Sequence, residues 1–558
     1  MKISRDHILI LLIGVILFVP FLGASPLFDW DEVNFAEASR EMILTGNYTQ
    51  TQIDFQPFWE KPPLFFWLQA ASMKVFGINE FAARFPNAVC GIITLLVLFS
   101  IGKQLKDQRL GWLWVLAYAG SILPHFYFKS GIIDPWFNLF IFLALYYFIR
   151  YSGNSFYLRY LFYSGILLGL AVLTKGPVAG LIAGLVILIY FIIQRFRFFP
   201  PLKHILLYFV FIALPIIPWI TIEIINNGTW FIGEFLKYQL RLATTEDASH
   251  GGFFGYHFII IFFFCFPASA FAVRSLIKSQ DDDQVILNFR RWMLILFWVV
   301  MIVFSIVQTK IIHYSSLAYF PLTFLAAYGL YSLKTQWRKL ENALLIITGV
   351  IFSSLVALVP IVIQLPGLKL LVNDEFTRMA LNTEGGWNGY EFLLSLIMLS
   401  GLIVSFVLNY KNQLQKAVTI LFISSMITIN LVLNIFTPHI ARYSQGSLLD
   451  FFKAAQEKDC YTDVVGYKSY IQLFYGERME TDIKNPRYLS WLKNAHPDFD
   501  GDPIYYRKYY SEWLLNGNID KPVYFATTVR KKNMFDPLPQ LQHLYEKNGY
   551  VFYKRDPQ

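Results

Sequence analysis

Carboxylates and a lysine whose chemistry could serve group transfer stand close together near the start of the chain. Asp31 and Glu32 follow Asp29-Trp30, and Glu60 directly precedes Lys61 and two prolines. A carboxylate at a helix start can act as a general base on an acceptor hydroxyl or amine, while a lysine can bind a phosphate. The plainer alternatives are that Asp31 caps a helix and that Lys61 extends from the membrane interface toward water. The acidic cluster by itself favours capping.

Further ionisable groups stand at the ends of apolar runs, where a charge is costly unless it has a partner or a function. These groups are Lys129, Asp134, Lys175, Lys310, His313 and Tyr314. A separate polar stretch holds Tyr238 and Arg241 and continues to His250. Each group alone could equally well orient a helix in the membrane. Together, several cations and at least two carboxylates on one side suit a reaction in which a lipid-borne phosphate is the leaving group.

Spacing by itself indicates no metal site and no disulfide framework. His250 and His257 match no zinc spacing rule, so His250 is interpreted from spacing as a solvated loop histidine. The cysteines Cys90, Cys265 and Cys460 are scattered and form no CxxC pair.

The composition is that of a membrane protein. Hydrophobic residues make up 56% of the chain and charged residues 15%, against roughly a quarter charged in soluble domains. Apolar runs near the ~20 residues that span a bilayer predict an all-α polytopic protein with about thirteen transmembrane helices. The predicted spans are 8–25, 86–102, 110–124, 135–150, 156–173, 178–194, 205–224, 256–273, 292–307, 315–333, 343–364, 388–409 and 417–436.

Lysine and arginine are concentrated in alternate short loops, and this bias predicts a cytoplasmic N-terminus. The long loop 26–85 and the segment 437–558 then lie outside, and residues 1–436 form the transmembrane domain. The formal charge of +9 follows from this bias, so it is not interpreted as a nucleic-acid footprint.

The elements that must position the polar residues lie in loop 26–85. Residues 34–44 show helical patterning, with Phe35 and Met42 on one face and Glu37 and Arg40 on another. A second helix is predicted from Pro62-Pro63 to Gly77. Both helices are expected to lie along the membrane surface.

A small α/β domain is predicted at the C-terminal end. Strand-like pieces occur at 463–467 and 522–528, and Asn548-Gly549 predicts a hairpin turn. No catalytic motif is visible in this domain.

The motifs in loop 26–85 have a specific order and spacing. They are Asp31-Glu32-Val33-Asn34-Phe35-Ala36-Glu37, Arg40-Glu41-Met42, Glu60-Lys61-Pro62-Pro63-Leu64, and Phe76-Gly77 through to Arg84. In these motifs the sequence resembles the polyprenyl-phosphate-sugar-dependent glycosyltransferases, which include the lipid A 4-amino-4-deoxy-L-arabinose transferases and the protein O-mannosyltransferases. The bacterial aminoarabinose branch is the most similar. Weaker matches occur at Asp134, Leu173 to Pro177, His250 to Phe253, and Lys310 to Tyr314.

The resemblance implies an inverting glycosyltransferase with the C-type membrane fold. Such an enzyme moves a sugar, aminoarabinose-like or a hexose, from undecaprenyl or another polyprenyl phosphate to lipid A, a protein or a glycan. It works in the bacterial inner membrane with its active site facing the periplasm, and its donor is lipid-linked.

The resemblance also implies roles for individual residues. Asp31 would be the catalytic base or a carboxylate that orients the acceptor, and Glu32 would support it, with Asp134 as a further catalytic candidate. The substrate-binding candidates are Lys61, Lys175, Arg241, Lys310, His313 and Tyr314, and four of them, Lys61, Arg241, Lys310 and Tyr314, would hold the donor phosphate. Glu60 and His250 would hold a divalent metal, zinc or magnesium.

Two other classes of membrane protein compete with this interpretation. A transporter or flippase of a lipid-linked substrate would share the composition and could use buried charges along its pathway. A polymerase or ligase of surface polysaccharide would also use lipid-linked donors. The long first loop with two surface helices argues against transport, and the paired Asp31-Glu32 and Glu60-Lys61 motifs argue against the second class.

Overall fold

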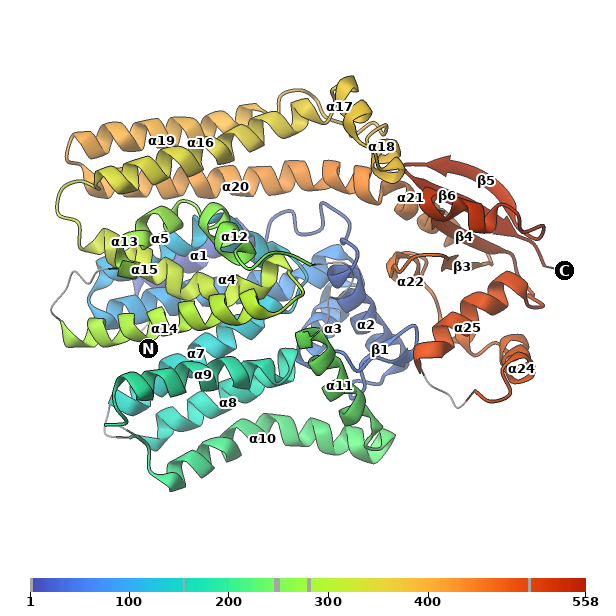
Figure 1. Ribbon diagram of the computed structural model, residues 1–558, viewed down its shortest axis with the longest axis horizontal. Helices are drawn as coiled ribbons and strands as arrows, with labels where there is room; N and C mark the ends of the chain where they lie inside the picture. Colours follow the sequence, from blue (N-terminus) through green and yellow to red (C-terminus); the bar gives the residue numbers. More distant parts are fainter. Residues whose placement is uncertain are drawn as a thin grey trace.

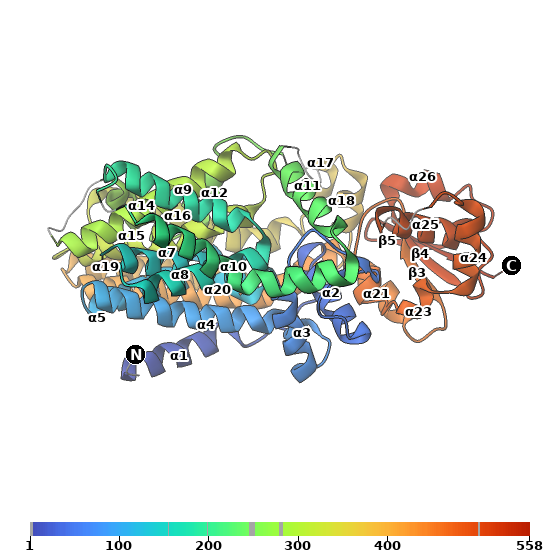
Figure 2. The same cartoon turned by 90° about the horizontal axis from the view of Figure 1, so that it is seen from below.

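The computed structural model describes residues 4–153, 156–197, 199–244, 251–277, 283–499 and 503–557. Long helices run side by side through most of the molecule, and a four-stranded sheet with its own helices lies at one end (Figure 1). The view from below separates the same two regions, with α2 and α3 close to where they meet (Figure 2).

Seven helices in the described part of the chain are long and apolar enough to cross a membrane. They are α4 (Glu80–Leu105), α8 (Leu158–Lys175), α10 (Leu202–Asn227), α14 (Gln284–Ile306), α16 (Lys339–Val362), α19 (Leu393–Tyr410) and α20 (Leu414–Ser444). A bent pair, Ile122–Lys129 with Asp134–Gly153, raises the number to eight if it forms one span. The chain is therefore a multi-pass membrane protein.

The other predicted spans coincide with shorter or broken helices. These are α1 (Arg5–Phe18), α5 (Gln108–Ala119), α6 (Ile122–Phe126), η1 (Tyr127–Lys129), α7 (Asp134–Gly153), α9 (Val178–Ile193), α12 (Tyr256–Phe264), α13 (Ala268–Ile277), η2 (Ile312–Ala318) and α15 (Tyr319–Tyr331). The count of thirteen stays a prediction, because these helices do not meet the length and composition of a full span by themselves.

The two helices predicted in the first loop are present as α2 (Asp31–Thr45) and α3 (Leu64–Phe76), with a short hairpin of β1 (Gln52–Ile53) and β2 (Gln56–Pro57) between them. Gly46 ends α2 with a φ of 71°, a left-handed conformation that suits glycine. The prediction of these helices is confirmed.

The polar face of α2 is not solvated, which corrects the amphipathic interpretation of this helix. Glu37, Arg40 and Glu41 are all buried. Arg40 pairs with Glu37 at 2.8 Å and donates to the carbonyl oxygen of Leu473 at 3.3 Å. Buried charges persist only with such partners. One of these partners, the carbonyl oxygen of Leu473, belongs to the C-terminal part of the chain.

The C-terminal sheet has the strand order β3-β4-β6-β5. Strands β3 (Tyr461–Val464) and β4 (Val523–Thr528) are parallel, and β6 (Tyr550–Arg555) pairs antiparallel with β4 and with β5 (Gln542–Lys547). Asn548 and Gly549, with φ of 55° and 81°, form the two-residue turn between β5 and β6. The predicted hairpin and the strand predicted at 522–528 are thus confirmed, whereas the strand predicted at 463–467 lies two to three residues earlier in the chain.

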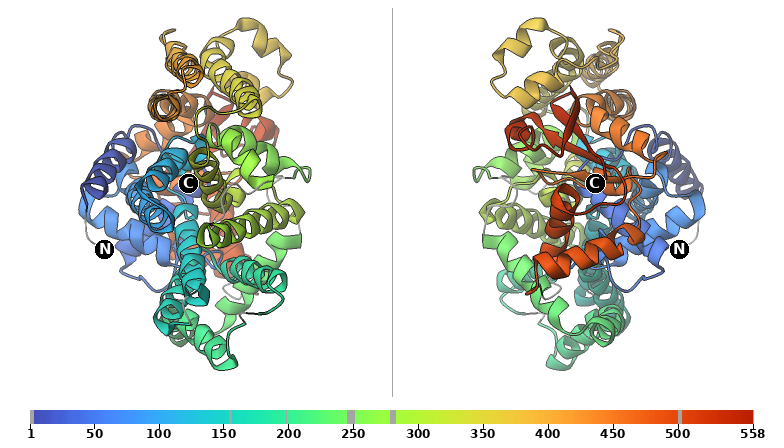
Figure 3. Two further views of the ribbon diagram at one scale, coloured as in Figure 1. Left: turned by 90° about the vertical axis from the view of Figure 1, so that its left-hand side faces the viewer. Right: turned by 90° about the vertical axis from the view of Figure 1, so that its right-hand side faces the viewer.

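Short helices lie next to this sheet, at the end of the molecule that faces the viewer in the right-hand view of Figure 3. They are α21 (Gly446–Ala455), α22 (Ile471–Phe474), α23 (Glu480–Ile483), α24 (Pro486–Ala495), α25 (Pro503–Asn516), η3 (Val529–Lys531) and α26 (Lys532–Phe535). The remaining helices are α11 (Trp230–Thr244), α17 (Pro366–Leu371) and α18 (Glu375–Ala380), which lie outside the predicted spans.

Candidate active site

Two cavities meet at the start of α2. The larger has a volume of about 800 Å³ and the smaller about 450 Å³. Both are lined by Asp29, Trp30, Asp31, Ile311 and His313. A carboxylate at this junction can be approached by two substrates from two sides.

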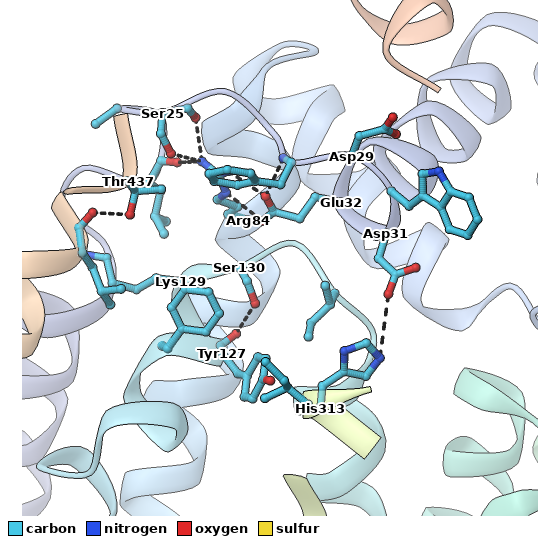
Figure 4. A pocket seen from close by; sticks show the side chains of 18 of the residues that line it. Ser25, Asp29, Asp31, Glu32, Arg84, Tyr127, Lys129, Ser130, His313 and Thr437 are labelled. Atoms are coloured by element: carbon cyan, nitrogen blue, oxygen red, sulfur yellow. Dashed lines mark hydrogen bonds and ion pairs between the residues drawn. The ribbon is translucent and has the colours of Figure 1, made fainter. Parts of the chain in front are cut away.

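Asp31 is the first residue of α2, and its side chain is 43% exposed toward the cavities. Its Oδ2 atom lies 3.7 Å from Nε2 of His313 (Figure 4). The same imidazole nitrogen lies 3.8 Å from Oδ2 of Asp134, and Lys175 Nζ donates to Asp134 Oδ1 at 2.6 Å. The structure thus brings four predicted site residues into one chain of polar contacts.

Burial lowers the pKa of His313, against the opposite influence of Asp134. The imidazole is therefore neutral near pH 7, and it can exchange a proton with a neighbouring group. Asp134 starts α7, and its contact with Lys175 joins that helix start to the end of α8. His313 thus lies within 4 Å of two carboxylates, those of Asp31 and Asp134.

Glu32 lines the smaller cavity, and its ion pair holds the start of α2 in place. Arg84 of α4 binds its carboxylate with both Nε, at 2.9 Å, and Nη2, at 2.7 Å. The backbone amides of Gly131 and Phe28 donate to the same carboxylate at 2.6 and 3.0 Å. Although burial opposes its charge, Arg84 and these amides keep the pKa of Glu32 below its usual value. These contacts suit the predicted supporting role.

Cations line the larger cavity from several elements. Lys61 Nζ lies 4.9 Å from the centre of the Tyr238 ring, and the Arg241 guanidinium lies 5.2 Å from the same ring. Lys175 Nζ lies 5.2 Å from the centre of the Tyr314 ring. Burial lowers the pKa of Lys61, while Glu60 opposes this shift. Tyr238 and Arg241, which the sequence places in a polar stretch, lie on the helix α11.

Lys310 is the predicted phosphate ligand that the structure separates from this group. It lines the smaller cavity, and its ammonium donates to the carbonyl oxygens of Phe304, at 3.1 Å, and Ser305, at 2.8 Å, and to that of Val307. Its charge thus satisfies carbonyl groups at the C-terminal end of α14. A role in phosphate binding stays a prediction.

Only one of the two predicted metal ligands lies in the described part of the chain. Glu60 lines the larger cavity beside Lys61. His250 falls in 245–250, outside the described residues. Among the described residues, no group of three His, Cys, Asp or Glu side chains could hold a metal. The described residues do not form a metal site on their own.

Two residues of the C-terminal part also line the larger cavity, Lys468 and Tyr470. The main-chain amide of Tyr470 donates to Asp29 Oδ1 at 3.2 Å, and the indole of Trp30 donates to the carbonyl oxygen of Lys468 at 3.1 Å. Sequence reasoning missed both residues, because no motif marks them and more than 400 positions separate them from Asp29 and Trp30.

With this geometry in hand, the chain can be compared with known proteins. The family model for dolichyl-phosphate-mannose-protein mannosyltransferase matches residues 60–220. An undecaprenyl phosphate-alpha-4-amino-4-deoxy-L-arabinose arabinosyl transferase of Aeromonas salmonicida is 27% identical over 319 residues, covering 55% of this chain and 56% of the relative. The protein of the same name from Shewanella sediminis is 25% identical, covering 72% of this chain and 74% of the relative.

Among solved structures, ArnT from Cupriavidus metallidurans bound to undecaprenyl phosphate aligns with 99% of this chain and 99% of its own chain. The TM-score is 0.76 at 16% sequence identity. The apo state of the same protein gives a TM-score of 0.73 at 17% identity. This likeness establishes the fold, so the predicted class is confirmed as an ArnT-like, mainly helical membrane fold.

The sequence matches are partial, since the chain covers 56% of the Aeromonas relative and 74% of the Shewanella relative. Within these limits, the chain resembles the polyprenyl-phosphate-sugar glycosyltransferases of the aminoarabinose and O-mannosyl types.

Proposed function

We propose that this chain is an inverting glycosyltransferase that moves a sugar from undecaprenyl phosphate, or another polyprenyl phosphate, to an acceptor in the cell envelope. The observation that carries the proposal is the position of Asp31, a carboxylate at the junction of two cavities. One of these cavities is lined by Lys61, Lys175 and Arg241. A base next to a cationic cavity suits a donor with a phosphate leaving group.

The larger cavity is proposed to hold the donor. Its apolar wall, which includes Leu181, Leu236 and Val303, suits the first isoprene units, while Lys61 and Arg241 suit the phosphate. Positive charge near the leaving oxygen stabilises the negative charge that develops there as the bond to the sugar breaks. The phosphate remains attached to the lipid throughout.

The chemical step is a single displacement at the anomeric carbon. Asp31 accepts the proton of the acceptor hydroxyl or amine as that atom bonds to the anomeric carbon. The bond between this carbon and the phosphate oxygen breaks, and its electron pair goes to the phosphate. His313, held between Asp31 and Asp134, is proposed to share the proton afterwards. Because attack and departure occur on opposite faces, the configuration inverts.

The proposed location is the bacterial inner membrane with the site facing the periplasm. The bias of lysine and arginine toward alternate loops supports this orientation. We also propose thirteen spans in residues 1–436 and a periplasmic C-terminal domain in residues 437–558. Lipid-linked donors and envelope acceptors would then meet on one side of the membrane.

The names of the relatives suggest an aminoarabinose-like sugar, and a hexose is the second choice. Lipid A, a protein or a glycan are the proposed acceptors. A zinc or magnesium ion held by Glu60 with His250 is retained as a separate proposal. Transfer measured with a chelator, and again after each metal is restored, tests it.

The proposed function is tested with the purified chain in vesicles that contain a labelled polyprenyl-phosphate sugar and an envelope extract. Label in a lipid, protein or glycan product supports transfer and identifies the acceptor. If the label instead crosses the vesicle membrane unchanged, the chain is a transporter or flippase. The relatives reported above are named as transferases and give that alternative no support.

A further inference from the structure

The segment between β3 and α22 is held by contacts of three consecutive residues, two of which bind the residues that directly precede α2. The carbonyl oxygen of Lys468 accepts from Trp30, and the amide of Tyr470 donates to Asp29. Between them, the carbonyl oxygen of Ser469 accepts from Arg507 Nη2 at 2.6 Å. This segment therefore forms an ordered part of the wall of the larger cavity, and side chains from two different parts of the chain hold it in place.

The side chain of Lys468 is presented to the cavity by aromatic rings. Its Nζ lies 4.8 Å from the centre of the Trp30 ring and 5.5 Å from that of Tyr470. Such contacts hold an ammonium group in place without neutralising it. The residue remains exposed to solvent, so that a ligand can reach it.

The charge of Lys468 is retained in this position. Partial desolvation of the exposed ammonium opposes its charge, but Tyr470 and Glu60 outweigh this effect, and the pKa of Lys468 lies above its usual value. Lys175, by comparison, is paired directly with Asp134 at 2.6 Å. Lys468 therefore brings a positive charge to the cavity from a part of the chain that carries none of the predicted catalytic residues.

We propose that Lys468 is a substrate-contacting residue whose ammonium binds an oxyanion, so that the C-terminal part of the chain completes the active site. The oxyanion is a phosphate oxygen of the donor or an anionic group of the acceptor. This inference rests on the proposed function. The competing explanation is that Lys468 only helps to attach the segment to Trp30.

The test compares Lys468→Met with Lys458→Met in the full chain, reconstituted with a labelled polyprenyl-phosphate sugar and a purified acceptor. Lys458 is a matched control because its Nζ also lies over a ring, 4.5 Å from the centre of Tyr524, yet it lines neither cavity. Lys468→Met should raise KM for one substrate by roughly tenfold, the effect of losing one hydrogen bond to a charged group, with kcat little changed. Lys468→Arg should restore KM.

The substrate whose KM rises identifies the source of the oxyanion. That KM should also rise with ionic strength in the wild type and rise less in Lys468→Met, because salt screens an exposed charge. Unchanged KM for both substrates overturns the inference. The inference is also overturned if Lys468→Met and the polar variant Lys468→Gln both lower the melting temperature and both change kcat as well as KM. If the wild type transfers no sugar, it is the proposed function that fails.

Discussion

Asp31 is the residue on which the proposed chemistry depends. Asp31→Asn keeps the size of the side chain but removes its ability to accept a proton. We expect kcat to fall by roughly 10² to 10⁴, the usual contribution of a general base, with donor binding and melting temperature preserved. The control is Asp459→Asn, at a position that is 80% exposed. Full transfer by Asp31→Asn would exclude this carboxylate as the base.

The role of Lys61 can be tested against a matched control, because the same loop contains a second lysine in a similar setting. Lys74 Nζ lies 4.5 Å from the centre of the Tyr48 ring, but Lys74 lines neither cavity. Lys61→Met should raise KM for the polyprenyl-phosphate donor by roughly tenfold, while Lys74→Met should leave it unchanged. Equal effects of the two variants would assign Lys61 a structural role.

We expect the protonation of Asp29 to make the stability of the fold depend on pH. Burial raises the pKa of Asp29 to about 6, although Ser469 and Tyr470 donate to its carboxylate. The folded chain therefore binds this proton more tightly than the unfolded chain does. The stabilisation is present below about pH 4 and is lost as the pH rises to about 6, by at most about 3 kcal/mol.

Thermal unfolding in detergent between pH 4 and 7 measures this effect. The wild type should lose stability over that interval, and Asp29→Asn should show a flatter profile, because the amide does not ionise. Asp459→Asn, at an exposed position, should behave as the wild type. A profile in Asp29→Asn as steep as that of the wild type would show that another group is responsible.

At the scale of elements, the position of α2 depends on α4. Arg84 of α4 binds Glu32 with two nitrogen atoms and also donates to the carbonyl oxygens of Leu22 and Ser25, both at 2.8 Å, and of Pro26 at 2.9 Å. Lysine keeps the charge but cannot form this planar set of bonds. Arg84→Lys should therefore destabilise the fold by on the order of 2 kcal/mol and lower kcat, because Asp31 is adjacent to Glu32.

Melting temperature and transfer rate, measured together, check this prediction. Arg150→Lys is the control, since Arg150 lies at the other end of α7 from Asp134 and donates to the polar side chains of Gln104 and Tyr160. If kcat is normal in Arg84→Lys while the melting temperature falls, α2 keeps its place by other contacts.

Local patterns were sufficient to predict most elements. Apolar runs located the membrane helices, Pro62-Pro63 and Gly77 marked the limits of α3, and Asn548-Gly549 marked the hairpin. Local patterns could not predict that the polar face of α2 is buried. Its polar residues look like a solvated face, but Arg40 bonds to the carbonyl oxygen of Leu473, more than 400 positions away. Periodicity indicates that a face is polar and does not indicate what covers it.

At the scale of the whole molecule, the same limit applies to the site. The sequence was sufficient to predict that Asp31 and Glu60-Lys61 belong to one site, because the two motifs lie in one loop. The chain of contacts from His313 through Asp134 to Lys175 joins three helices, and Lys468 reaches the cavity from the C-terminal part. Each of these contacts depends on how distant segments pack, which one sequence does not reveal.

Arg478 connects the C-terminal part of the chain directly to the first loop. Its Nη1 binds Asp54 of the first loop at 2.9 Å, and its Nη2 binds Asp463 of β3 at 3.0 Å. All three side chains are buried. Removing one partner of a buried pair leaves an uncompensated charge and costs about 3 to 5 kcal/mol, far more than an exposed pair.

Arg478→Met should therefore loosen the C-terminal part from the first loop, increase its cleavage by a protease, and reduce transfer, because Lys468 and Tyr470 lose their position in the cavity wall. Arg530→Met is the control, as Arg530 forms an exposed pair with Asp374 in the same region. Adding Asp54→Asn and Asp463→Asn to Arg478→Met removes the unpaired charges and should restore protease resistance. If transfer returns with it, the C-terminal part acts through its attachment. If resistance returns without transfer, Arg478 has a further role in shaping the site.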